Sequence, residues 1–133
     1  ELEIHNVSLK GTVLKPNMII PGSECKDKAS SEEIAKKTLD CLKKNVPSDV
    51  PGIAFLSGGQ SEIDASKHLN EINKINDTNF LITFSYGRGL QASALKAFGK
   101  NLNDSKKIQD VFAHRAKMNS LASKGEWSQS LEI

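Results

Sequence analysis

Three short stretches of the sequence carry residues that could bind or react with an anionic substrate. Lys15 ends the apolar run 12–14 and is followed by Pro16. The other two stretches are rich in glycine: SGGQ at 57–60 and SYGRG at 85–89. Each follows a short apolar run, so the elements that carry these runs decide whether the three stretches form one site.

The lysine at the end of the first apolar run has two interpretations. Lys15 can point into water where a strand simply ends, or it can be presented to a site as an amine nucleophile. A free lysine has a pKa of about 10.4 and is almost wholly protonated at pH 7. An apolar strand end and neighbouring cations would lower that pKa and allow attack on a carbonyl with formation of a Schiff base. The residues alone leave both interpretations open.

The two glycine-rich stretches have the chemistry of an anion site. Gly58 and Gly59 precede a predicted helix start, where backbone N–H groups and the helix dipole favour negative charge. Gly87 leaves its backbone uncovered, and the planar guanidinium of Arg88 matches phosphate oxygens. Taken singly, each stretch is better explained as a tight turn or a solvated arginine. Their occurrence at neighbouring strand ends favours a phosphate site.

Three strand–helix units are predicted to position these stretches. We expect strands over 7–14, 52–56 and 80–84, and helices over 31–45, 61–74, 90–98 and 105–124. Short apolar strands that alternate with helices are typical of an α/β fold with a parallel sheet buried on both faces. Ligand sites in such folds form at the carboxyl ends of the strands. Three parallel strands leave two open edges, so we expect the chain to be part of something larger.

The helices carry their own start signals and core faces. Ser30 and Glu33 form a predicted capping box at the first helix start, and Gly125 is expected to end the last helix. Apolar spacing predicts these buried positions: Ile34, Thr38, Cys41 and Leu42 in the first helix, Ala65, Leu69 and Ile72 in the second, and Ile108, Phe112 and Leu121 in the last.

Composition excludes several classes of protein. The 133 residues have a formal charge of +2, with 38% hydrophobic and 26% charged residues, so nothing predicts disorder or nucleic-acid binding. The apolar runs are too short to cross a membrane, and no secretion signal is visible at the N-terminus. His5, His68 and His114 lie far apart, so no metal site is expected. Cys25 and Cys41 favour reduced thiols, with a disulfide left open.

Four segments of the sequence closely resemble signature segments of class I fructose-bisphosphate aldolase. They are GTVLKPNM (11–18), VPGIAFLSGGQSE (50–62), LITFSYGRGLQASALKAFG (81–99) and FAHRAKMNSLASKGEW (112–127). The segments occur in the family's order, and the match runs from about Val7 to Trp127. The resemblance implies a TIM (β/α)8 barrel, of which residues 1–133 are the C-terminal part: strands six to eight with their helices. Residues 126–133 then begin the C-terminal tail.

The resemblance also implies roles for individual residues. Lys15 corresponds to the Schiff-base lysine. The segment that holds one substrate phosphate corresponds to Leu56, Ser57, Gly58, Gly87 and Arg88. Two positions depart from the family pattern: Lys10 stands where an acidic residue is usual, and Gly89 replaces the usual alanine. The family's acid–base carboxylates, second phosphate ligands and terminal tyrosine are expected outside this sequence.

The implied function is reversible cleavage of fructose 1,6-bisphosphate to dihydroxyacetone phosphate and glyceraldehyde 3-phosphate, with no metal and no cofactor. By the same resemblance, we expect a cytoplasmic homotetramer that needs the N-terminal barrel half and associates with the cytoskeleton through actin. The fragment alone is expected to be inactive. Two alternatives stay open: a catalytically silent half-barrel that serves as an interaction module, and another Schiff-base aldolase of the same barrel class.

Overall fold

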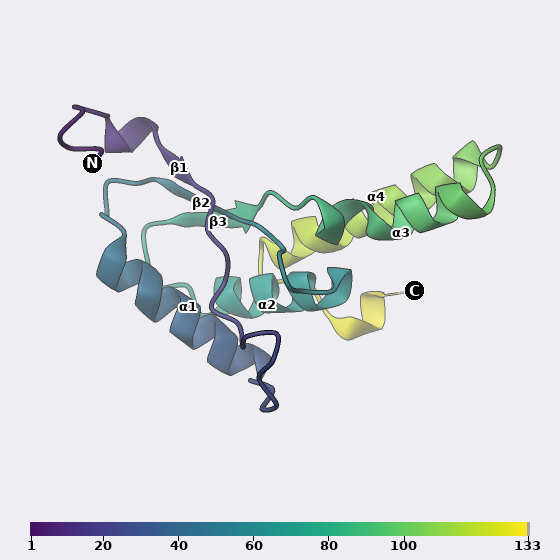
Figure 1. Ribbon diagram of the computed structural model, residues 1–133, viewed down its shortest axis with the longest axis horizontal. Helices are drawn as coiled ribbons and strands as arrows, with labels where there is room; N and C mark the ends of the chain where they lie inside the picture. Colours follow the sequence, from purple (N-terminus) through teal and green to yellow (C-terminus); the bar gives the residue numbers. More distant parts are fainter. Residues whose placement is uncertain (133) are drawn as a thin grey trace.

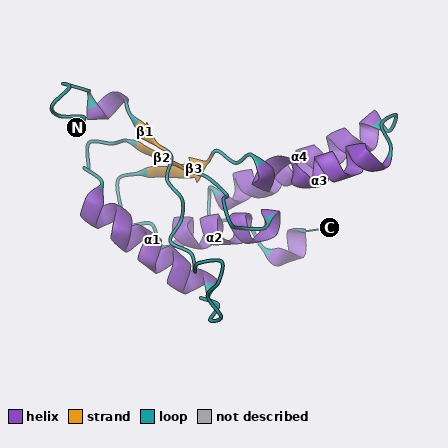
Figure 2. Cartoon of the chain, viewed as in Figure 1, coloured by secondary structure: helices purple, strands orange, loops and turns teal. Residues whose placement is uncertain are grey.

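The chain folds into three strand–helix units followed by a long helix. A computed structural model describes residues 1–132. The elements, in order, are a 3-10 turn (Leu9–Gly11), β1 (Val13–Leu14), α1 (Ser31–Asn45), β2 (Gly52–Phe55), α2 (Glu62–Lys74), β3 (Leu81–Phe84), α3 (Arg88–Lys100), α4 (Ser105–Ala122) and a second 3-10 turn (Gln129–Leu131) (Figure 2). The predicted alternation of strands and helices is confirmed.

The three strands form one parallel sheet in the order β1-β2-β3. Val13 pairs with Gly52 at one end of β2, and Phe55 pairs with Phe84 at the other. Helices α1 and α2 lie along the same side of this sheet, while α3 and α4 form a hairpin that extends away from it (Figure 1). Helix α4 also packs against α2, which joins the hairpin to the body of the molecule.

The sheet is buried on one face only. Ile53 and Phe55 are completely buried and Ile82 is nearly so. Side chains alternate along a strand, and Leu81 on the other face is 77% exposed. The prediction that both faces are buried is therefore wrong for residues 1–132, because α1 and α2 cover only one of them.

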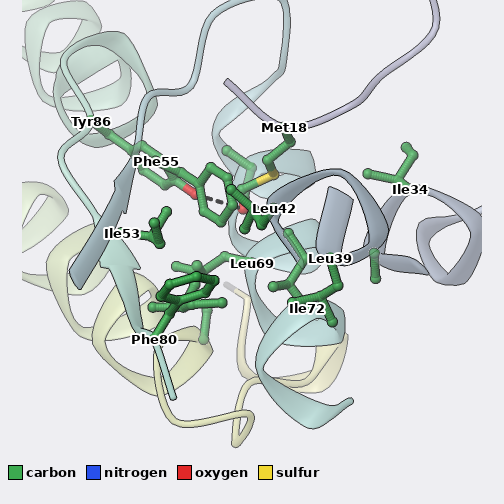
Figure 3. Packing of buried hydrophobic residues seen from close by; sticks show 14 of the residues in the cluster. Met18, Ile34, Leu39, Leu42, Ile53, Phe55, Leu69, Ile72, Phe80 and Tyr86 are labelled. Atoms are coloured by element: carbon green, nitrogen blue, oxygen red, sulfur yellow. Dashed lines mark hydrogen bonds between the residues drawn. The ribbon is translucent and has the colours of Figure 1, made fainter. Parts of the chain in front are cut away.

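The hydrophobic core fills the space between the sheet, α1 and α2 (Figure 3). Apolar side chains at a spacing of three or four along both helices face the strands. The large side chains of this core include Met18, Leu39, Leu42, Ile53, Phe55, Leu69, Ile72, Phe80 and Tyr86. The predicted core positions Ala65, Leu69 and Ile72 of α2 are all fully buried, so helical spacing located this face correctly.

Local start and stop signals account for the bounds of α1. The Ser30 hydroxyl accepts the Glu33 backbone N–H at 3.2 Å, which satisfies one free donor of the first turn. The Glu33 carboxylate instead pairs with Lys37 at 2.7 Å, so the predicted capping box is formed on one side. The helix ends just before Pro47, whose ring disfavours helical backbone in the preceding residue.

The predicted strand over 7–14 is wrong for most of its length. Residues Leu9–Gly11 form a 3-10 turn, and the Thr12 hydroxyl donates to the Ser8 carbonyl at 3.1 Å. Only Val13 and Leu14 pair with β2. An edge strand extends only as far as its neighbour offers backbone partners, and the partners in β2 begin at Gly52.

Two predictions about buried helix faces also need correction. Cys41 is exposed, whereas Leu39, which was not predicted, is buried on that helix. In α4, Phe112 is 40% exposed, and Ile108 and Leu121 are only half-buried. The buried residues of α4 are Arg115, Met118, Asn119 and Ala122. The face of α4 that packs against α2 is thus partly polar, which an apolar pattern cannot show.

Candidate functional site

The carboxyl ends of the three strands lie at one edge of the sheet. Backbone pairing continues past the strands: the Leu56 N–H donates to the Pro16 carbonyl at 3.0 Å, and the Ser85 N–H donates to the Phe55 carbonyl at 2.8 Å. Because the strands are parallel, the loops that follow them meet at the same edge. The structure therefore brings Lys15 and both glycine-rich stretches to one region, as the sequence predicted.

Lys15 is exposed at this edge, between Leu14, which is 37% exposed, and the half-buried Pro16. The loop that follows it is tied to the neighbouring loop, because the Asn17 side-chain amide donates to the Gly58 carbonyl at 3.3 Å. Residues 1–132 do not supply the apolar enclosure that we expected around the Lys15 amine. Lys15 nevertheless lies beside β2, because Leu14, the residue before it, pairs with Ile53.

The loop after β2 turns sharply into α2. Gly59 has a φ of +78°, a backbone conformation that side chains rarely tolerate. The Gln60 N–H donates to the Ser57 carbonyl at 3.2 Å and closes the turn. Ser61 then caps α2, since its hydroxyl accepts the Asp64 N–H at 3.1 Å. Ser57, at 8% exposure, is buried, whereas Gly58 beside it is half-buried.

The loop after β3 leads into α3 through a glycine. Gly87 occupies the N-cap position and provides no side-chain cap. Arg88, the first residue of α3, is exposed. The Gly89 N–H donates to the Ser57 hydroxyl at 3.1 Å, so the two glycine-rich loops are in direct contact. Backbone N–H groups at a helix start, a hydroxyl and a guanidinium in one region can bind an anion.

Several residues that support these loops were not singled out in the sequence. The Tyr86 hydroxyl donates to the Ala65 carbonyl at 3.0 Å and fixes the third loop on α2. Burial raises the pKa of Tyr86 well above its ordinary value, so its phenol can still donate at a pH where a free tyrosine would ionise. The Glu62 carboxylate accepts the Ser93 N–H at 3.0 Å and also the Ser93 hydroxyl, which joins the starts of α2 and α3.

His68 supports the loop after β2 from two turns along α2. Its Nδ1 lies 2.7 Å from the Gln60 side-chain oxygen. Burial lowers the pKa of His68, with an opposing contribution from Asp64, and so favours the neutral imidazole. Gln60 lies in the turn just before α2, so this contact ties the turn to the helix that follows it.

No metal-binding arrangement is found in the described part of the chain: His, Cys, Asp and Glu side chains do not gather in groups of three or more. Cys25 and Cys41 are exposed free thiols. Among residues 1–132, no helix is both long enough and apolar enough to cross a membrane.

Parallel strand–helix units whose loops meet at the carboxyl edge of the sheet define a portion of a parallel α/β domain. The family model of class-I fructose-bisphosphate aldolase matches residues 1–132. The chain therefore belongs to the class I fructose-bisphosphate aldolase family.

Individual relatives agree with this assignment. Fructose-bisphosphate aldolase B of Sparus aurata is 53% identical over 131 residues, which are 97% of this chain and 36% of that protein. The muscle-type aldolase of Lethenteron camtschaticum is 52% identical over 95% of this chain and 35% of its own length. The solved aldolase of Plasmodium falciparum, in complex with TRAP and an inhibitor, superposes with a TM-score of 0.87 at 43% identity, over 92% of this chain and 35% of that one. The chain thus spans about a third of the length of these relatives.

Proposed function

We propose that this chain provides the imine-forming lysine and one phosphate site of an aldolase that cleaves fructose 1,6-bisphosphate. The observation that carries the proposal is the meeting of Lys15, Ser57 and Arg88 at one edge of a parallel sheet. These are the residues that the family resemblance assigns to the imine and to the phosphate. The remaining barrel strands and the acid–base groups come from the part of the enzyme that this chain does not span.

The proposed reaction begins when the neutral Lys15 amine attacks the C2 ketone of the substrate. Loss of water leaves a protonated imine, which draws electrons from the bond between C3 and C4. A base outside this chain takes the C4 hydroxyl proton, glyceraldehyde 3-phosphate departs, and an enamine remains on Lys15. Protonation at C3 and hydrolysis of the imine then release dihydroxyacetone phosphate and regenerate the amine.

The phosphate site would orient this chemistry rather than take part in it. In the proposal, Ser57 and Arg88 hold the phosphate of the dihydroxyacetone half, together with backbone groups of Leu56, Gly58 and Gly87. A substrate fixed by its phosphate presents its ketone to Lys15 in one geometry, which converts binding energy into rate. The three strands are proposed as strands six to eight of a TIM barrel, with residues 126–133 as the beginning of the tail.

Borohydride trapping tests this proposal in the full-length enzyme that carries these residues. Borohydride added with dihydroxyacetone phosphate should reduce the imine and attach the substrate to Lys15, which peptide mass spectrometry locates. Lys15→Ala should abolish the labelling. The matched control is Lys10→Ala, at an exposed lysine in the neighbouring 3-10 turn, which should label fully. Full labelling of Lys15→Ala would overturn the assignment of the nucleophile.

A second candidate function is a catalytically silent interaction module. One observation favours it: the Plasmodium falciparum aldolase, to which this chain is similar, was solved with TRAP bound. Intact mass spectrometry of the native protein separates the two. A mass near 14.5 kDa supports the module, whereas the mass of a complete aldolase subunit supports the enzyme.

The assembly and location of the enzyme belong to the same proposal. By the family resemblance we propose a cytoplasmic homotetramer that associates with actin. Size-exclusion chromatography with light scattering tests the tetramer, and co-sedimentation with actin filaments tests the association.

A further inference from the structure

The start of α3 is capped by a residue from another part of the chain. Gly87 at the N-cap has no side chain to satisfy the free N–H groups of the first turn. The Ser57 hydroxyl, 32 residues earlier in the sequence, accepts the Gly89 N–H at 3.1 Å in a buried contact. Ser57 therefore does for α3 what a serine at the N-cap does for an ordinary helix.

This contact decides the direction of the Ser57 hydroxyl proton. Because the Ser57 oxygen accepts from Gly89, its own O–H must donate elsewhere. Among residues 1–132, the structure shows the Ser57 hydroxyl only as an acceptor, from Gly89. The oxygen also faces the positive end of the α3 dipole, which makes the hydroxyl a stronger donor toward an anion.

The contact depends on the missing side chain of Gly89. A Cβ at this position would lie 2.8 Å from both Cβ and Oγ of Ser57, and 3.3 Å from the ring of Tyr86. Neither neighbour can move freely: Ser57 is 8% exposed, and Tyr86 is 7% exposed and hydrogen-bonded to α2. An alanine, which the family pattern usually has here, would push the helix start and Ser57 apart.

We infer that Gly89 is a positioning residue that orients the Ser57 hydroxyl as a donor to the substrate phosphate. The inference rests on the proposed function, since it assumes that Ser57 binds the phosphate of the dihydroxyacetone half. Gly89 acts through Ser57: its N–H holds the hydroxyl oxygen, and its lack of a Cβ permits the approach.

The variant Gly89→Ala in the full-length enzyme tests the inference. The readout is the ligand concentration for half-maximal borohydride trapping, measured with dihydroxyacetone phosphate and with dihydroxyacetone. Loss of one charge-assisted hydrogen bond should raise the first value about tenfold. The second value should stay unchanged, because dihydroxyacetone has no phosphate. An unchanged value for dihydroxyacetone phosphate, or an equal rise for both ligands, would overturn the inference.

Gly99→Ala is the matched control. Gly99 lies in the same helix, and a Cβ there would meet nothing within 4 Å. This variant should leave both trapping values unchanged. If the unsubstituted enzyme forms no imine, the proposed function fails together with the inference. If the unsubstituted enzyme forms the imine normally and the trapping values of Gly89→Ala equal those of the unsubstituted enzyme, only the inference fails.

A double-mutant cycle with Ser57→Gly identifies the route of the effect. Ser57→Gly removes the two atoms that would lie 2.8 Å from an alanine Cβ at position 89 and leaves only the Tyr86 ring at 3.3 Å. In that background, Gly89→Ala should change the trapping value less than about twofold, whereas independent effects would multiply. Should Gly89→Ala alone fail to fold, the double variant should fold again. A double variant that stays unfolded, or effects that multiply, would overturn the inference.

Discussion

Arg115 and Glu132 form an ion pair in the interior, between α4 and the end of the described chain. The two guanidinium nitrogens of Arg115 donate to the two carboxylate oxygens of Glu132 at 2.9 and 2.6 Å. The Trp127 indole N–H donates to the same carboxylate at 2.7 Å, and Arg115 also donates to the Ser66 hydroxyl of α2 at 2.9 Å. This network fixes the segment after α4 against α2, the helix that follows the first glycine-rich loop.

Replacing Glu132 with glutamine should lower the free energy of unfolding by about 3 kcal/mol, because Arg115 is left buried without a counter-charge. The two side chains are only 5% and 9% exposed. Urea unfolding followed by fluorescence of Trp127, the single tryptophan, measures the effect. Asp110→Asn is the control, since it breaks the exposed Lys106–Asp110 pair of the same helix and should have little effect. Equal effects of the two variants would contradict the prediction.

The same pair should make stability depend on pH in the acid range. Burial raises the pKa of Glu132, but hydrogen bonds from Arg115 and Trp127, together with the Arg115 charge, outweigh it and hold the pKa below the ordinary 4.5. A carboxyl with a lowered pKa stabilises the fold above the unfolded-state pKa, and this contribution is lost as the pH falls through the folded-state value. The stability difference from Glu132→Gln should therefore shrink below about pH 4.5. A difference that stays constant with pH would contradict this prediction.

Tyr86, the only tyrosine, should resist ionisation while the protein is folded. Burial raises the pKa of its phenol above the ordinary 10.0, with a smaller opposing effect of the Arg115 charge. The ultraviolet absorbance of phenolate, recorded as the pH is raised, should appear only together with unfolding. The urea-unfolded chain is the control and should titrate near pH 10. Ionisation near pH 10 with the far-ultraviolet circular dichroism intact would show that Tyr86 is not enclosed.

Arg88 should contribute to substrate binding in the full-length enzyme. If its guanidinium binds a phosphate, Arg88→Ala should raise KM for the bisphosphate about tenfold or more, and Arg88→Lys should recover part of the loss. Lys96→Ala removes another exposed cation of α3 and should leave KM unchanged. Steady-state kinetics measure all three variants. An unchanged KM in Arg88→Ala would argue against the phosphate role.

Local signals in the sequence predicted much of the fold because they act between neighbours in the chain. The serine cap at position 30 located the start of α1, and apolar spacing located the α2 core face. The prediction of a strand over 7–14 was wrong for most of its length, because strand pairing depends on the neighbouring strand as well as on the local sequence. The predicted buried face of α4 was wrong, because the polar side chains of Arg115 and Asn119 are buried against partners that lie far away in sequence.

The sequence by itself determined the parallel strand–helix order, the family, and the three strand ends that carry Lys15, Ser57 and Arg88. These follow from residue types and from alternation along the chain. Only the tertiary structure decided that Ser57 caps α3 by accepting the Gly89 N–H, and that Glu132 is the counter-charge of Arg115. Both contacts join segments that are distant in sequence, and they form only where packing brings the backbones within hydrogen-bond distance.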